Sequence, residues 1–196
     1  MEDLKQKSDK MAAIEEMEFG CLKFLQKTTL DLEFLRRILD DFEPHSYTLG
    51  GVEIADNDVH TVLGIPPGTS LVPKSVFKQE VNAIKGKFGK KTLAKLKEDI
   101  KITEVVDEDF KKMLLLYILA NFLCPAVKDK LSEVLYSVIS VASDAQKYNW
   151  AKFVLKWLVD TVKNCEKRGK GGIEGYLFFL KVDLTNSKHN YIIYFM

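Results

Sequence analysis

Residues 107–122 are the segment that most restricts how this chain can fold. Apolar side chains would cover nearly every side of a helix built there, at Phe110, Met113, Leu114, Tyr117, Ile118 and Phe122. A helix that is apolar all round is stable only when other elements surround it. Asp107 suits the position before such a helix, and Pro125 ends it. The apolar run 113–127 is shorter than the about 20 residues that cross a bilayer, so it predicts the central helix of a folded core.

Amphipathic helices are expected around that core. Their apolar residues recur three and four positions apart, with charged residues between them. Asp56 is a suitable N-cap for one of them, and Gly64 suits the left-handed position at its end. The expected helices cover residues 8–25 with a bend near Gly20, 28–42, 56–63, two pieces within 76–96, 128–141 and 150–168.

Residues 47–54 carry the pattern of a small hairpin, because Gly50 and Gly51 lie between short arms that favour β structure. The sequence therefore predicts a mainly α fold: a single helical globular domain of about seven to eight helices with a small β-hairpin near residues 47–54. Residues 1–19 are expected to be a helical lead-in, residues 173–184 a final short helix or strand, and residues 185–196 a divergent apolar tail.

Charge and cysteine content exclude several classes of protein. The 29 basic residues nearly balance the 28 acidic ones, so the overall charge indicates no particular partner. The cysteines, Cys21, Cys124 and Cys165, are far apart and lack the spacing of metal ligands, which argues against a zinc site or a disulfide framework. No apolar stretch typical of a secretory signal follows Met1, so an intracellular location, nuclear or cytoplasmic, is expected.

The sequence contains no recognisable catalytic arrangement. No nucleophile in a suitable context accompanies His45, His60 or His189, and we interpret His60 as a partly buried polar residue of the 56–63 helix. Residues 85–92 resemble a phosphate-binding loop, but the glycine spacing is wrong and no buried strand precedes them. We interpret them as a solvated, flexible loop. We therefore expect no enzyme activity, no cofactor and no metal site.

Lysines are concentrated in the middle of the chain. Residues 74–101 contain nine lysines and three acidic residues, a net charge of about +6 by count. Several cations on one face attract nucleic-acid phosphates without reading base sequence. Arginine, the usual reader of bases, occurs only at Arg36, Arg37 and Arg168, so any contact with nucleic acid is expected to be non-specific. The candidate basic contact surface consists of Lys85, Lys87, Lys90, Lys91, Lys95 and Lys97.

Three segments, in order, resemble the aminotransferase-like plant mobile domain, a helical module of plant proteins and transposon-encoded reading frames. They are residues 52–54 with 58–66 (DVHTVLGIP), residues 119–125 (LANFLCP), and residues 149–159 with 177–180. The resemblance implies one helical domain over residues 20–184. It implies a transposon-derived plant module that acts through protein or nucleic-acid contacts in chromatin or transposon-related complexes. It implies no transaminase, because nothing here provides the lysine and large α/β scaffold that would hold pyridoxal phosphate.

The end of the chain suggests a second hypothesis. The similarity stops after Leu184, and the apolar residues 191–195 would be buried or would seek a partner or a membrane. Such an ending suits a truncated or recently altered gene. The alternative function is therefore a short cytotoxic or protective element of the toxin and antidote type, active in hybrid incompatibility or cell death. A protein partner of unidentified kind is also expected.

Overall fold

The computed structural model describes residues 8–24, 40–74, 76–124 and 131–168, and at Lys23, Phe24 and residues 165–168 it describes the backbone alone. Helices dominate these residues, beside one small antiparallel sheet, which confirms the predicted mainly α fold. Most of the helix predicted over residues 28–42, and the predictions for the tail beyond residue 172, lie outside the described residues.

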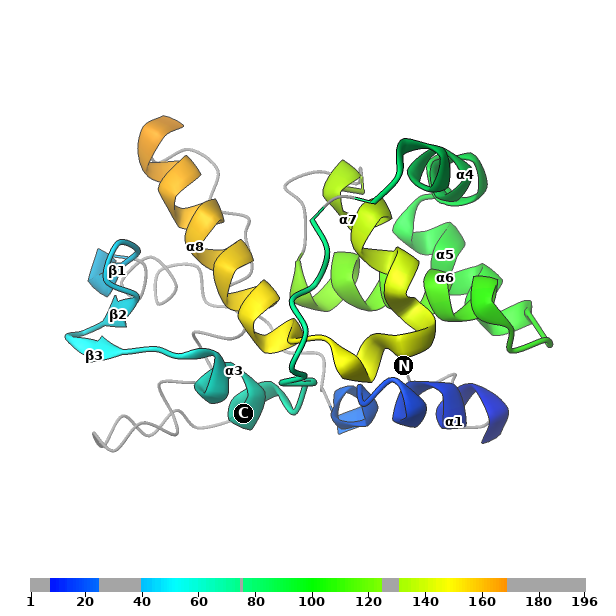
Figure 1. Cartoon of the computed structure of the whole chain (residues 1–196), viewed down its shortest axis with the longest axis horizontal. Helices are drawn as coiled ribbons and strands as arrows, with labels where there is room; N and C mark the ends of the chain where they lie inside the picture. Colours follow the sequence, from blue (N-terminus) through cyan, green and yellow to red (C-terminus); the bar gives the residue numbers. More distant parts are fainter. Residues whose placement is uncertain (1–7, 25–39, 75, 125–130, 169–196) are drawn as a thin grey trace.

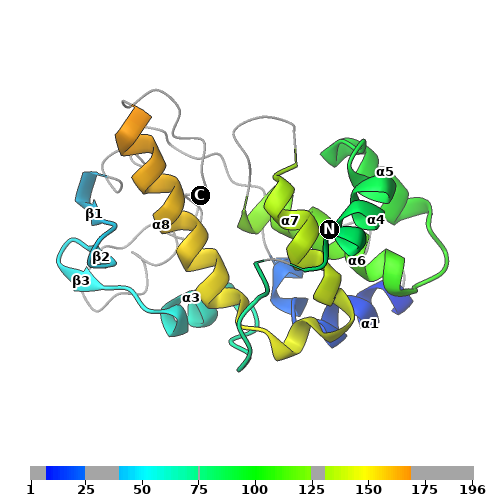
Figure 2. The same cartoon turned by 45° about the horizontal axis from the view of Figure 1, so that its top comes forward.

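Figure 1 shows how the helices and strands are arranged in space. The sheet and α3 lie at one end of the molecule with α8, and α1, α4, α5 and α6 lie at the other end in both Figure 1 and Figure 2. The elements are α1 (Ser8–Glu16), the 3-10 helix η2 (Gly20–Phe24), β1 (Phe42–Glu43), β2 (Thr48–Leu49), β3 (Val52–Glu53), α3 (Asp56–Leu63), α4 (Lys78–Phe88), α5 (Leu93–Ile102), α6 (Glu108–Ile118), the π-helical turn η3 (Leu119–Leu123), α7 (Glu133–Val138), the 3-10 segment η4 (Ile139–Lys147) and α8 (Trp150–Arg168).

The predicted central helix is α6. The Asp107 side chain caps it by accepting a hydrogen bond from the backbone N–H of Phe110 at 2.8 Å, as the sequence predicts. All residues from Met113 to Ile118 are buried, because α5 and η4 pack against the helix. The helix continues into η3, where the wider π turn carries Leu119 and Leu123 into the same core.

The predicted hairpin is formed by β2 and β3, with Leu49 paired to Val52. Gly50 and Gly51 connect the strands with φ of 56° and 82°, the left-handed conformation that a tight two-residue hairpin turn requires. A third strand, β1, pairs with β2 and was not expected. The sheet is therefore slightly larger than the sequence predicts.

The N-terminal helix belongs to the same core as the rest of the described chain. Its residues Ala13 and Ile14 are buried, and the chain reverses at Glu18, whose φ is 59°, before η2 begins at Gly20. The predicted bend near Gly20 is confirmed. Lys10 of this helix, which sequence reasoning did not single out, is only 2% exposed. Its Nζ donates hydrogen bonds to the carbonyl oxygens of Ile100 at 2.5 Å and Lys101 at 2.7 Å, and so joins α1 to the end of α5.

Two element boundaries differ from the predictions. Residues 85–88 were expected in a flexible loop, but they form the last turn of α4, because Ile84 and Phe88 lie four residues apart and are both buried. The helix expected over residues 128–141 corresponds to α7, which ends at Val138. The 3-10 segment η4 follows it and includes the turn expected at residues 143–145. Apolar side chains are buried at both places, Phe88 at the end of α4 and Val138 with Ile139 where α7 meets η4.

Candidate functional site

The candidate basic contact surface lies on α4, on α5 and on the turn between them, which carries Lys90 and Lys91. Buried residues of both helices, Ile84 on α4 and Leu96 on α5 among them, face the core, so lysines occupy the outer sides. Thr92 separates the helices and caps α5 by accepting a hydrogen bond from the backbone N–H of Lys95 at 3.2 Å. Figure 2 shows α4 and α5 next to α6, far from the sheet.

Two of the predicted lysines bind carboxylates of neighbouring helices. The Nζ of Lys85 lies 2.9 Å from Oε1 of Glu133 on α7, and the Nζ of Lys87 lies 2.6 Å from Oδ2 of Asp109 on α6. The hydrogen bond to Asp109 is the main cause of a raised pKa for Lys87. Both carboxylates come from distant parts of the chain, so no sequence pattern could have indicated these pairs.

Two more lysines hold one carboxylate between them. Asp99 on α5 accepts hydrogen bonds from Lys91 and, at 3.1 Å, from Lys95, which also lies 2.9 Å from Glu98. The hydrogen bond from Lys91 is the largest cause of the lowered pKa of Asp99. Hydrogen bonds to Glu98 and Asp99 raise the pKa of Lys95. The spacing of Lys95 and Asp99, four residues apart on one helix, is a signal that sequence reasoning could have used.

The remaining two lysines of the candidate surface, Lys90 and Lys97, are exposed, and no ion pair joins either to another described residue. The same is true of Lys74 and Lys78, which were not included in the predicted set. Residues 74–101 contain nine lysines and three acidic residues. The ion pairs with Glu133 on α7 and Asp109 on α6 add two carboxylates, which leaves about four positive charges by count. The region therefore stays basic after pairing, but its accessible cations are fewer than the sequence suggests.

A second notable arrangement joins the start of α8 to the start of α3. Asn149 begins α8 by accepting a hydrogen bond from the backbone N–H of Lys152 through Oδ1, at 2.7 Å. Its Nδ2 donates to Asp56 at 2.9 Å, and its backbone N–H donates to the carbonyl of Ser70 at 2.7 Å. Asp56 was expected to cap α3, but its carboxylate instead holds the start of α8. One side chain thus aligns two helices.

Trp150 extends this junction into the core. Its backbone N–H donates to the carbonyl of Pro66 at 3.0 Å, and the N–H of Ala151 donates to the same oxygen at 3.3 Å. Its indole Nε1 donates to the carbonyl of Ala145 at 2.7 Å, so the polar atom of a fully buried ring is satisfied.

The turn after α3 depends on Gly64, whose φ of 60° closes the helix with a hydrogen bond from its N–H to the carbonyl of His60 at 2.7 Å. The ring Nδ1 of His60 lies 2.7 Å from the carbonyl oxygen of Ile65. His60 is half-buried and holds the turn, as its interpretation as a partly buried polar residue predicts. The Sγ of Cys21 is so close to Gly64 that a Cβ there would lie 2.4 Å from it.

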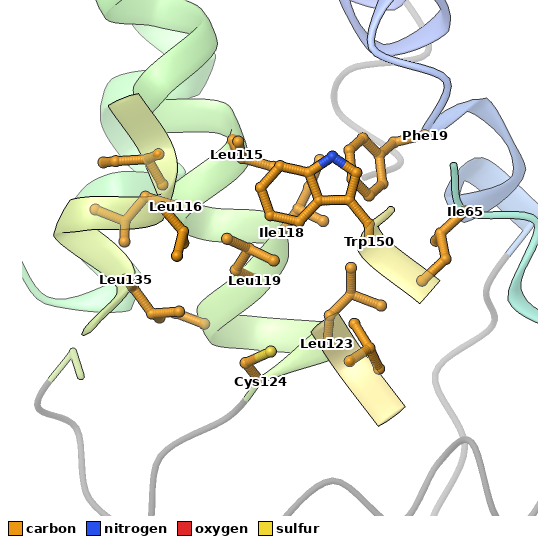
Figure 3. Packing of buried hydrophobic residues seen from close by; sticks show 14 of the residues in the cluster. Phe19, Ile65, Leu115, Leu116, Ile118, Leu119, Leu123, Cys124, Leu135 and Trp150 are labelled. Atoms are coloured by element: carbon orange, nitrogen blue, oxygen red, sulfur yellow. The ribbon is translucent and has the colours of Figure 1, made fainter. Parts of the chain in front are cut away.

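The three segments of the resemblance share one buried cluster. Figure 3 shows Ile65 from the first segment, Leu119 and Leu123 from the second and Trp150 from the third, close to Phe19 of the N-terminal part. The rings of Phe19 and Trp150 meet edge to face with centroids 5.8 Å apart. Residues 177–180 of the third segment lie outside the described residues. The described motif residues therefore build the core and its turns.

Comparison with known protein families identifies one match. A family model described as a domain of unknown function, DUF8566, matches residues 1–181. The chain belongs to the DUF8566 family. The match covers all the described elements of this DUF8566 chain, from α1 to α8. Neither curated proteins nor solved structures give a significant match.

Other polar groups of the DUF8566 chain offer little chemistry. Within residues 8–24, 40–74, 76–124 and 131–168, no three His, Cys, Asp or Glu side chains are grouped so that they could hold a metal ion. Burial raises the pKa of the Cys124 thiol well above its ordinary value, which keeps it protonated and poorly nucleophilic. No helix in the described part of the chain is both long and apolar enough to cross a membrane.

Proposed function

We propose that this DUF8566 chain is a non-enzymatic interaction module that contacts nucleic-acid phosphates through α4 and α5. The contact is electrostatic and independent of base sequence, and it operates in nuclear complexes associated with chromatin or transposons. The observation that carries the proposal is the surplus of about four positive charges that remains on this region after its ion pairs are counted.

The chemistry of the surface supports phosphate contact without base readout. Lys90 and Lys97 are exposed, and an ammonium group on a flexible stem can follow a phosphate backbone as a point charge. No arginine lies between Lys74 and Lys101, so the bidentate contacts that identify guanine are missing from this surface.

We also propose that the domain shares its origin with the plant mobile domain. The support is the joint packing of the three resembling segments around Trp150, together with their order along the chain. The proposal accordingly places the protein in plant nuclei, where such modules act.

The experiment measures binding of a fluorescent 20-base-pair DNA duplex by anisotropy over a range of salt concentrations. Lys90→Glu with Lys97→Glu removes the two unpaired cations of the candidate surface but leaves the pairs of Asp99 intact. We expect affinity to fall by about tenfold or more, and the slope of log K against log salt to fall by about 2, because each lost phosphate contact removes about 0.9 from the slope.

Lys152→Glu with Lys163→Glu on α8 is the matched control, because it changes net charge equally on a helix outside the proposed surface, and neither lysine forms an ion pair with another described residue. This control variant should bind the duplex nearly as well as the original protein. Equal loss in both variants would mean that only net charge matters, and an unchanged duplex affinity in the Lys90 and Lys97 variant would refute the proposed surface.

A further inference from the structure

Phe77 is the most exposed large hydrophobic side chain among the described residues, at 86%. Exposing a phenyl ring forgoes about 2 kcal/mol of burial free energy, so a ring left in water contributes little to the fold. Phe77 stands directly before α4, at the edge of the basic region.

The backbone of Phe77 is held in place although the side chain is exposed. The carbonyl of Phe77 accepts hydrogen bonds from the backbone N–H groups of Glu80 at 3.0 Å and Val81 at 3.2 Å, so the backbone is held by the first turn of α4. Helices favour Ser, Thr, Asp or Asn here because those side chains accept a further hydrogen bond, which Phe cannot do. No side-chain cap bond is formed at this end of α4. The helix therefore gains nothing from a phenyl ring at this position.

Two lysines lie close to Phe77 in the sequence, three residues before it and one residue after it. Lys74 and Lys78 are both exposed, and neither forms an ion pair with another described residue. Proteins that bind single-stranded nucleic acid combine lysines that contact phosphates with an aromatic ring on which a base stacks. The ring and the two lysines supply both parts.

A membrane and a protein partner fit these observations less well. An interfacial helix must lay an apolar face on the lipid, but Ile84 and Phe88 of α4 are buried in the core. Protein docking usually uses an apolar patch of several hundred Å², whereas the exposed residues Lys78 and Glu80 adjoin Phe77. Stacking requires only one accessible ring, which the structure provides.

We propose that Phe77, with Lys74 and Lys78, forms a stacking site for one base of single-stranded nucleic acid. The inference rests on the proposed function, since it adds a preference for unpaired strands to the electrostatic contact of α4 and α5. A base within a duplex is already stacked on its neighbours and presents no face to Phe77, so duplex binding should not use the ring.

The test compares Phe77→Ala, Phe77→Leu and Phe77→Trp for binding to a fluorescent single-stranded 20-mer of thymidine and to the 20-base-pair duplex. Phe77→Ala should weaken single-strand binding by about five- to a hundredfold and leave duplex binding within about twofold. Phe77→Leu should behave like Phe77→Ala because it keeps an apolar side chain without a π face, whereas Phe77→Trp should retain binding. Thermal melts confirm that the exposed substitutions leave the fold intact.

The outcomes separate this inference from the proposed function. If the original protein binds both probes but none of the Phe77 variants loses single-strand affinity, the stacking site is refuted and the basic surface stands. If single-strand binding needs Phe77 but the Lys90 and Lys97 variant keeps duplex affinity, the stacking site stands and the proposed surface is wrong. Failure of the original protein to bind either probe refutes both. Loss of binding to vesicles containing phosphatidylserine in Phe77→Ala, restored by Phe77→Leu, would identify a membrane contact and overturn the stacking site.

Discussion

Replacing Trp150 by phenylalanine tests how much the buried indole at the start of α8 stabilises the fold. The indole is 0% exposed, and its Nε1 donates to the carbonyl of Ala145 at 2.7 Å. Phenylalanine loses this hydrogen bond, but the carbonyl keeps the backbone N–H of Tyr148 at 3.1 Å. The lost bond then costs about 1 kcal/mol. The lost ring atoms and the cavity they leave add about 1.5–2 kcal/mol, so Trp150→Phe should lower the free energy of unfolding by about 2–3 kcal/mol.

Urea unfolding followed by far-ultraviolet circular dichroism measures this change without depending on tryptophan emission. Trp157→Phe is the matched control, because the same substitution falls on a half-buried ring of the same helix and should cost less than about 1 kcal/mol. A loss of 2–3 kcal/mol corresponds to a fall of about 5–10 °C in Tm for a chain of this size. Equal midpoints for the two variants would refute the reasoning that the buried indole of Trp150 stabilises the core.

Two further predictions concern a turn and an ion pair. Gly64→Ala should lower Tm by several degrees, because φ is 60° and the added Cβ would lie 2.4 Å from the Sγ of Cys21, whereas Gly86→Ala, with open space around it, should not. A Tm for Gly64→Ala at or above that of the original protein would contradict this. Because Lys91 lowers the pKa of Asp99, the stability it contributes is present above the ordinary carboxyl pKa and is lost as pH falls through the folded-state value. Asp99→Asn should therefore lose less stability on acidification below about pH 4 in urea titrations than the original protein, and identical pH profiles would exclude this role.

Local patterns predicted much of the described structure. The periodicity around Met113 and the cap at Asp107 located α6, and Gly50 with Gly51 located the hairpin. These signals act between residues close in sequence, where capping, turn geometry and apolar spacing decide the conformation. Predictions failed where a local signal competed with burial, as at residues 85–88, where the buried Phe88 outweighed the loop character of lysine and glycine.

The candidate site was only partly predictable. The sequence located the basic segment, and the exposure of Lys97 agrees with its position on α5 away from the buried Leu96 and Ile100, whereas Lys90 lies in the turn between α4 and α5. The spacing of Phe77 from Val81 and Ile84 predicts that all three bury one helical face, and for Phe77, which is exposed, this prediction is wrong. The structure instead places Phe77 before the first turn of α4, outside that face.

The amino-acid sequence by itself determined the mainly α class, the buried central helix, the hairpin and the position of the lysines, because each follows from the spacing and type of neighbouring residues. Tertiary structure decided which of those lysines stay accessible. Glu133 and Asp109 reach Lys85 and Lys87 only because α6 and α7 pack beside α4, and Asn149 meets Asp56 only because α8 lies against α3. Charge and hydrogen-bond pairing between distant residues depends on distances of a few ångströms, which the folded core alone establishes.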